Sequence, residues 1–318
     1  MSARRTWFNA LGEKDFRATT LAIQAEHCQF VAWTLDNWAI TAFLEMHLNA
    51  IRHFSNIHTL EFHSVHIPVS IWDLRGPFQN VKSMLFSECR FEAFTAISFH
   101  SHINVRLTNL SIFGCHDLEP DHVVELSLFV FREPLRALHT DEYPLCSVIL
   151  GQAVPEHGSP IEELSLKFTS HWIANSSFIT ISRLLENAPH IQTLSLTHGP
   201  PPAYMGVSSL TISPLALPRL RSLHCPVNWA PGLARNRPVE QLRLVDTYGR
   251  HMLADEIIAA VSASSAVIKD LEISVDSFCA VPIHELCPGL QDLTLIPNRN
   301  SSYENSFARF EVDIFSCR

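Results

Sequence analysis

The chain has 318 residues, of which 47% are hydrophobic and 17% charged, a balance typical of folded proteins rather than disordered ones. Its 32 acidic residues outnumber the 23 Lys and Arg residues, and the net charge of -9 disfavours binding to nucleic acid or to an anionic membrane surface. The 10 Gly residues form no glycine-rich phosphate-binding motif, so we expect no nucleotide cofactor.

The first 17 residues show no signal peptide and no membrane anchor, because Asn9, Glu13 and Asp15 interrupt the apolar residues behind the basic start. We therefore expect an N-terminal extension over residues 1–17, whose order the sequence leaves open, and a repeat domain over residues 18–318. The eight cysteines include no C-x-x-C pair. Without a leader they are expected to be reduced thiols of a cytoplasmic or nuclear protein.

The main feature is a recurring phrase with apolar residues at its first, fourth and sixth positions. Its fourth position holds, in chain order, Leu60, Met84, Leu110, Leu164, Leu194, Leu223, Leu242, Leu271 and Leu293. Two phrases compete for the gap after Leu110. Leu138 divides this gap into 28 and 26 residues, whereas Leu126 divides it into 16 and 38, so Leu138 is favoured. Ten phrases then follow one another at intervals of 19 to 30 residues, and a weaker phrase surrounds Leu21.

Each phrase is predicted to be a short strand, followed by a turn and a helical or irregular return. Helical spacing of apolar residues predicts helices over residues 38–52, 121–131, 177–187 and 255–263, with Asp121 and Asp255 as N-caps. Small polar residues or Cys are expected where the chain leaves a strand, because their side chains satisfy backbone groups there. Seven of the ten repeats have one at this place: Cys89, Cys115, Thr169, Asn228, Thr247, Asp276 and Asn298.

These repeats resemble leucine-rich repeats of the ribonuclease-inhibitor-like group, whose period is about 20–29 residues. Residues 285–298, which include Cys287, Pro288 and Asn298, resemble the C-P-x-L-x-x-L-x-L-x-x-N phrasing of repeats in F-box proteins. Irregular repeats rich in Phe, His and Pro are similar to the C-terminal halves of many fungal F-box-like proteins. The resemblance covers residues 18–300 and implies an α/β fold: a curved solenoid of about ten to eleven repeats, with a parallel concave sheet and helices or irregular returns on the convex side.

In such a solenoid the residues between the apolar positions of each strand point to the concave face, where a protein partner would bind. We expect Phe113 to act as an apolar anchor on this face, and Lys167, His224 and Arg243 to act as its polar partners, because aromatic residues and Arg are enriched at interface hot spots. The remaining members of this candidate site are His139, Ser165 and Glu272.

Three pairs of histidines are spaced as metal ligands can be: His63/His66, His100/His102 and His116/His122. No zinc-binding motif accompanies them, so we expect no metal site. The sequence also contains no G-x-S-x-G motif and no recognisable set of nucleophile, base and orienting group. We therefore expect neither a cofactor nor enzymatic activity.

The sequence thus predicts a non-catalytic protein-interaction module. The resemblance to F-box proteins implies that it captures a degradation substrate for ubiquitination, in an assembly with a cullin and a Skp-type adaptor. Residues 1–38 contain no F-box-like run, so this role requires an F-box supplied elsewhere. The alternative is a structural scaffold or a degenerate F-box paralogue without a ligase.

Overall fold

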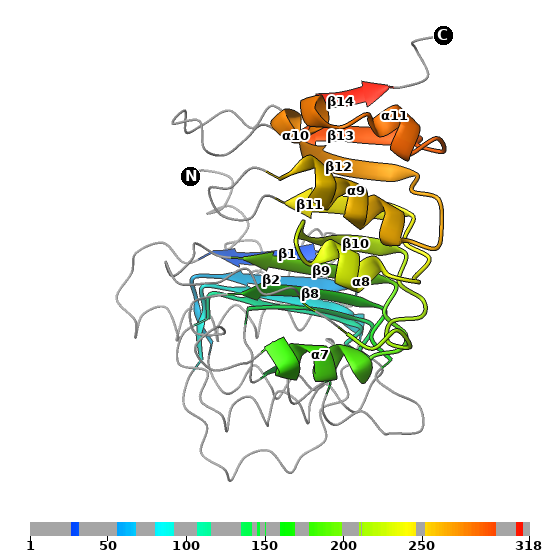
Figure 1. The fold of residues 1–318 in the computed structure, drawn as a ribbon. Helices are drawn as coiled ribbons and strands as arrows, with labels where there is room; N and C mark the ends of the chain where they lie inside the picture. The colour runs from blue at the N-terminus through cyan, green and yellow to red at the C-terminus, as the bar shows by residue number, and fades with distance from the viewer. Residues whose placement is uncertain are drawn as a thin grey trace, which may run out of the picture. The chain divides into compact units, whose positions relative to one another are not determined.

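The computed structural model describes residues 27–31, 56–67, 80–91, 107–115, 135–141, 145–146, 150, 160–168, 178–198, 210, 212–245, 252–296 and 310–313. The chain divides into two compact units, Met1–Val148 and Ile149–Arg318, called here the N-terminal unit and the C-terminal unit. Each contains short strands that pair mainly in parallel, and helices connect several strands of the C-terminal unit (Figure 1). The fold class is therefore α/β, as predicted.

In the N-terminal unit five of the described strands pair in the order β1-β2-β4-β6-β7, and the short strands β3 (His66–Ile67) and β5 (Arg90–Phe91) pair with each other in a separate sheet. Their bounds are β1 (His27–Val31), β2 (Thr59–His63), β4 (Ser83–Ser87), β6 (Asn109–Phe113) and β7 (Ala137–Thr140). Met84 pairs with Leu60 on one side and with Leu110 on the other. Leu110 in turn pairs with Leu138, which confirms the choice of Leu138 over Leu126.

The first of these strands was not predicted. In β1, Cys28 pairs with Leu60 and Phe30 pairs with Phe62, so a cysteine stands where other strands have leucine. The weak phrase around Leu21 lies outside the described residues, as do residues 1–17 and the predicted helices over 38–52 and 121–131.

Side chains alternate between two faces of these strands, as the period of a β-strand requires. One face, called here the packed face, carries the apolar positions of the phrases. Leu60 and Phe62 on it are fully buried, and the rings of Phe62 and Phe86 stack with centroids 5.2 Å apart. The opposite face, called here the open face, carries half-buried or exposed side chains such as Glu61, Ser87 and Phe113.

The C-terminal unit has six parallel strands among its described residues, in the order β8 to β13, and an antiparallel strand β14 beyond β13. Their bounds are β8 (Glu163–Phe168), β9 (Thr193–His198), β10 (Ser222–Pro226), β11 (Gln241–Val245), β12 (Asp270–Ser274), β13 (Asp292–Ile296) and β14 (Phe310–Asp313). The fourth positions of the phrases pair from strand to strand across β8 to β13, beginning with Leu164 and Leu194 and ending with Leu271 and Leu293. The predicted register is therefore confirmed in this unit.

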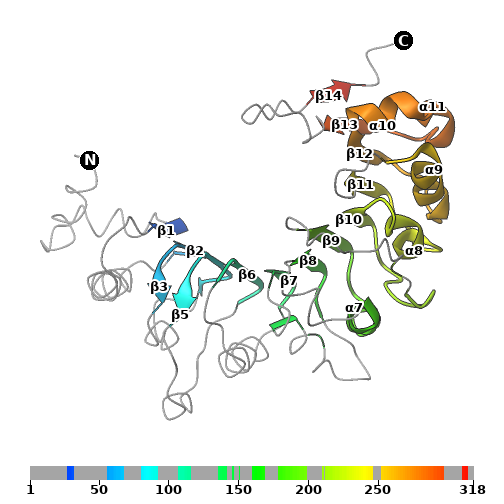
Figure 2. The same ribbon diagram turned by 60° about the vertical axis from the view of Figure 1, so that its left-hand side comes forward.

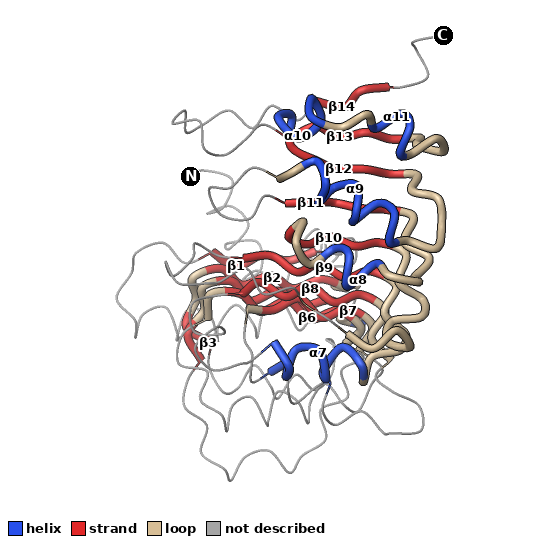
Figure 3. The backbone as a smooth tube through the Cα atoms, in the orientation of Figure 1, coloured by secondary structure: helices blue, strands red, loops and turns tan. Residues whose placement is uncertain are grey.

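Helices connect these strands at α7 (Phe178–Glu186), α8 (Ala230–Ala234), α9 (Ala254–Ala263), α10 (Val275–Ala280) and α11 (Ile283–Leu286). Figures 2 and 3 show α8 and α9 together on one side of strands β10 and β11. Trp229, the residue before α8, packs edge-on against Phe168 of β8 with ring centroids 5.5 Å apart. The helices thus cover the packed face and leave the open face to the polar side chains.

Helices α7 and α9 confirm two predicted helices, but the predicted cap of α9 is wrong. Asp255 lies in the first turn, and the N-cap is Leu253. The backbone N–H of Leu253 donates to Glu256 Oε2 at 3.1 Å, which satisfies a donor at the start of the helix. The carboxylate three residues after the cap therefore replaces the side-chain cap that was expected from Asp255.

One backbone arrangement recurs at the start of successive strands. The carbonyl of Gln192 accepts the N–H groups of Arg221 and Ser222, at 2.8 and 2.9 Å. The carbonyl of Lys82 accepts those of Thr108 and Asn109 in the same way, both at 2.9 Å. Equivalent residues repeat the same local geometry in both units, which is what a repeat architecture requires.

The turn after the strand also joins neighbouring repeats. Cys89 Sγ donates to the carbonyl of Phe62 at 3.3 Å, and Cys115 Sγ donates to that of Phe86 at 3.8 Å. Each accepting carbonyl belongs to the preceding strand, and both thiols are buried. These contacts confirm the predicted role of Cys89 and Cys115 in stabilising the turn.

The residue that directly follows each of the strands β2, β4 and β6 has a left-handed backbone. Ser64, Glu88 and Gly114 occupy this place in three successive repeats, with φ of 54°, 55° and 59°. Ser64 and Glu88 donate their N–H groups to a carbonyl of the next strand, whereas Gly114 donates to both carboxylate oxygens of Asp141, at 3.0 and 2.8 Å. Both oxygens of the Asp141 carboxylate therefore accept the backbone N–H of Gly114.

Candidate functional site

The open face of the C-terminal unit carries one continuous row of side chains, one from each parallel strand. Pairing of equivalent residues along β8 to β13 forms this row, which we call the central row: Ser165, Ser195, His224, Arg243, Glu272 and Thr294. Four predicted site residues, Ser165, His224, Arg243 and Glu272, thus lie in one line. All four hold the place between the fourth and sixth positions of their phrases, and the in-register pairing of the strands brings them into line.

Two contacts organise the central row. Ser195 Oγ lies 3.2 Å from His224 Nδ1, within hydrogen-bond distance. Arg243 Nε lies 3.7 Å from Glu272 Oε2. The Arg243 side chain is 52% exposed and that of Glu272 is 13% exposed, so the cation projects to solvent while the carboxylate is recessed.

Burial lowers the pKa of His224, an effect that Glu272 opposes and Arg243 reinforces. The ordinary pKa of histidine is 6.5, so at neutral pH His224 is uncharged. Arg243 is therefore the cation of the central row, and Glu272 is its carboxylate.

The lowered pKa of His224 predicts a loss of stability in acid. Because the unfolded chain takes up this proton more readily than the folded chain, the contribution is complete above about pH 6.5 and is lost as the pH falls through the folded-state pKa. We expect His224→Gln to reduce the fall in the free energy of unfolding between about pH 7.5 and about pH 5.5. Urea denaturation of both proteins measures the difference, and an equal fall in both would contradict the prediction.

The other predicted site residues are placed apart from the central row. Lys167 is exposed on the open face of β8, and it pairs with Thr197 of β9. Phe113 and His139 belong to the N-terminal unit, where both are half-buried on the open face. They occupy different rows there, because His139 pairs with Ser111 and Phe113 pairs with Ser87.

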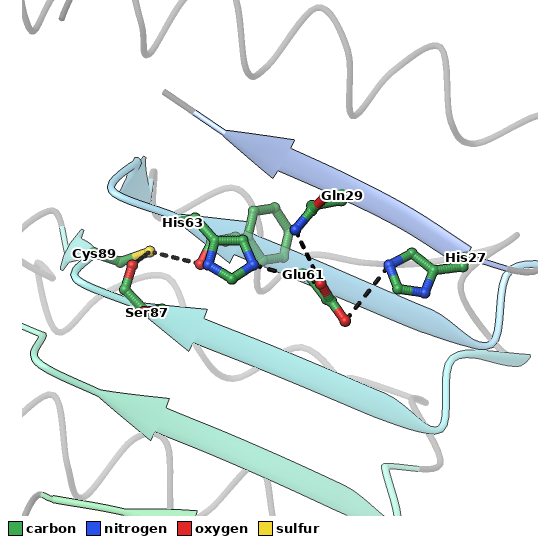
Figure 4. Close-up of polar contacts among 7 residues, drawn as sticks. His27, Gln29, Glu61, His63, Ser87 and Cys89 are labelled. Atoms are coloured by element: carbon green, nitrogen blue, oxygen red, sulfur yellow. Dashed lines mark hydrogen bonds and ion pairs between the residues drawn. The ribbon is translucent and has the colours of Figure 1, made fainter. Parts of the chain in front are cut away.

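A second polar cluster lies on the open face of the N-terminal unit, on β1 and β2. Glu61 is its centre: His27 Nε2 is 3.5 Å from Oε1, and His63 Nε2 is 3.4 Å from Oε2. Gln29 Nε2 also donates to Oε2 at 3.2 Å. Figure 4 shows the two imidazoles on opposite sides of this carboxylate. The cluster was not predicted, because it depends on strand β1, which the apolar pattern did not indicate.

Two observations on the described residues concern metal ligands and thiols. No group of three His, Cys, Asp or Glu side chains within them is arranged to hold a metal ion. Burial raises the pKa of Cys146 to about 12 and that of Cys287 to about 11, so both remain protonated thiols at neutral pH. Of the predicted histidine pairs, only His63/His66 falls in the described part of the chain.

The chain matches no family model, and no curated protein matches its sequence. Across the described ranges, no helix is both long enough and apolar enough to cross a membrane. The assignment of function therefore depends on the geometry of the two open faces.

Proposed function

We propose that this chain is a leucine-rich-repeat protein, a curved solenoid of the ribonuclease-inhibitor-like kind, that binds another protein on its open face without catalysing a reaction. The resemblance of the repeats to those of F-box proteins suggests capture of a degradation substrate as the biological use. The F-box and the cullin-type assembly would then come from another segment or chain. Reduced thiols are typical of the cytoplasm and nucleus, and six cysteines of the described residues are free thiols, namely Cys89, Cys115, Cys146, Cys225, Cys279 and Cys287.

The observation that carries the proposal is the in-register open face of β8 to β13. Six adjacent strands hold their half-exposed side chains in fixed rows, while the leucines behind them are buried. Binding to such a surface loses little conformational entropy, because the backbone and many side chains are already ordered. Side chains such as Arg243 are also of the types enriched at interface hot spots.

Affinity purification of the full chain from cell extract tests this function. The wild type is compared with Ser195→Trp, which places a bulky ring in the central row without touching the packed face. We expect the wild type to recover a specific protein that Ser195→Trp does not recover. Equal recovery by both would contradict binding on the open face.

The same experiment separates the ligase role from the scaffold role. Recovery of a cullin and a Skp-type adaptor together with the bound protein supports substrate capture for ubiquitination. A bound protein without either of them favours the scaffold or degenerate paralogue.

A further inference from the structure

We propose that the open face over β9, β10 and β11 recognises a protein segment through one Asp or Glu side chain, which binds the exposed edge of Arg243 beside an apolar neighbour. This inference rests on the proposed function, since it names the chemistry of the segment that the open face would bind.

The guanidinium of Arg243 has N–H donors that Glu272 does not use. It carries five N–H donors, which match the two oxygens of a carboxylate. Among the residues that the structure describes, its partner is Glu272, which approaches only the Nε side and at 3.7 Å. With the Arg243 side chain 52% exposed, the Nη groups are available to a carboxylate of another protein. Glu272 fixes the Nε side and so orients the guanidinium.

The surroundings of Arg243 favour an anion at this place. On β9, β10 and β11 the open-face positions hold Ser, Thr, Gln, the neutral His224, Pro226 and Val245, so Arg243 is the charged residue of this patch. Pro226 and Val245 pair with each other one row further along the strands. Val245 is half-buried and offers an apolar contact for the residue that follows or precedes the carboxylate, whereas Pro226 is buried.

The position of the carboxylates further along the sheet defines where the anion cannot bind. Asp270 and Asp292 pair on β12 and β13. The pKa of Asp270 is raised by burial, with a further contribution from Asp292. An added negative charge would be repelled there, so the acidic side chain belongs over β9 to β11. A single carboxylate fits better than a phosphate, because a doubly charged group calls for more than one cation.

Selection from a random dodecapeptide phage library on the immobilised full chain tests this inference. We expect the wild type to enrich peptides that carry Asp or Glu next to an apolar residue. A synthetic peptide from this set should bind Arg243→Gln about tenfold more weakly than the wild type, the effect of one exposed charged contact. The matched control Arg235→Gln makes the same change of charge at an exposed residue that follows α8, and its binding should be unchanged.

A second test reverses the charge of residue 243. Selection on Arg243→Glu should enrich Lys or Arg in place of the acidic residue. Enrichment without acidic residues on the wild type, or equal binding to Arg243→Gln, would overturn the inference. Thermal melting of each variant checks that it is folded.

The blocking variant Ser195→Trp separates this inference from the proposed function. If peptides lose binding to Ser195→Trp but not to Arg243→Gln, the open face is the site and only the acidic contact is wrong. If they bind Ser195→Trp as well as the wild type, or if no peptide is enriched, the proposed function is overturned together with the inference.

Discussion

Replacing Arg237 by methionine is expected to lower the free energy of unfolding by about 3–5 kcal/mol, because a fully buried cation then no longer holds five backbone carbonyls. Only 1% of Arg237 is exposed. Its Nε donates to the carbonyl of Ala216 at 2.8 Å, and Nη2 donates to that of Ser213 at 2.7 Å. Nη1 reaches the carbonyls of Gly232, Leu233 and Arg235, at 3.1, 2.9 and 3.1 Å.

The five carbonyls belong to two segments that Arg237 ties together. Ser213 and Ala216 are the ends of a turn, since Ala216 N–H donates to the carbonyl of Ser213 at 2.9 Å. The remaining carbonyls belong to α8 and to Arg235 just after it, where the last carbonyls of a helix have no N–H donor within the helix. Methionine fills much of the same space but donates nothing, so the buried hydrogen bonds to the carbonyls of Ala216 and Leu233 would be lost without replacement, whereas the carbonyl of Ser213 keeps the N–H of Ala216.

Arg235→Met is the matched control, because Arg235 is exposed and loses the same charge and the same donors. Its effect should stay within about 0.5 kcal/mol, as at most surface positions. Urea unfolding followed by circular dichroism measures both. If Arg237→Met lowers the free energy of unfolding no more than Arg235→Met does, the proposed role of Arg237 in joining the two segments is contradicted.

A charge at Leu194 is expected to cost more than about 4 kcal/mol and to unfold the C-terminal unit at moderate temperature. Leu194 is fully buried on the packed face of β9, between Leu164 and Leu223 of the adjacent strands. In Leu194→Asp the lost apolar contact adds to the desolvation of a carboxylate. Thermal melting gives the measurement.

Thr197→Asp on the same strand is the control. Thr197 is half-buried on the open face and pairs with the exposed Lys167, so a carboxylate there stays hydrated and meets a cation. Its effect should remain below about 1 kcal/mol. Similar losses from both substitutions would show that the two faces of β9 are assigned wrongly.

The repeat register could be predicted because it depends on a local pattern. Each strand must turn its leucine to the packed face, and a shift by one residue would expose it. Spacing alone therefore selected Leu138 over Leu126. The same reasoning failed at β1, where Cys28 holds the position that is leucine in most other repeats.

The candidate site was predicted only in part. Ser165, His224, Arg243 and Glu272 share the central row, whereas Phe113 and His139 lie on the other unit. Arg237 carries no sequence signal of its own, because an arginine between Asn236 and Pro238 would ordinarily be exposed. Its burial follows from carbonyls that come together only in the folded chain.

By itself the sequence determined the ten repeat strands (β2, β4, β6, β7 and β8 to β13) and which side of each is buried. These properties depend on apolar periodicity, which is local and can be counted along the chain. The tertiary structure alone decided that Arg243 projects beside a recessed Glu272, that two histidines flank Glu61, and that Arg237 joins a turn to a helix end. Such contacts join residues up to tens of positions apart, and their distances and burial arise only when the strands stack.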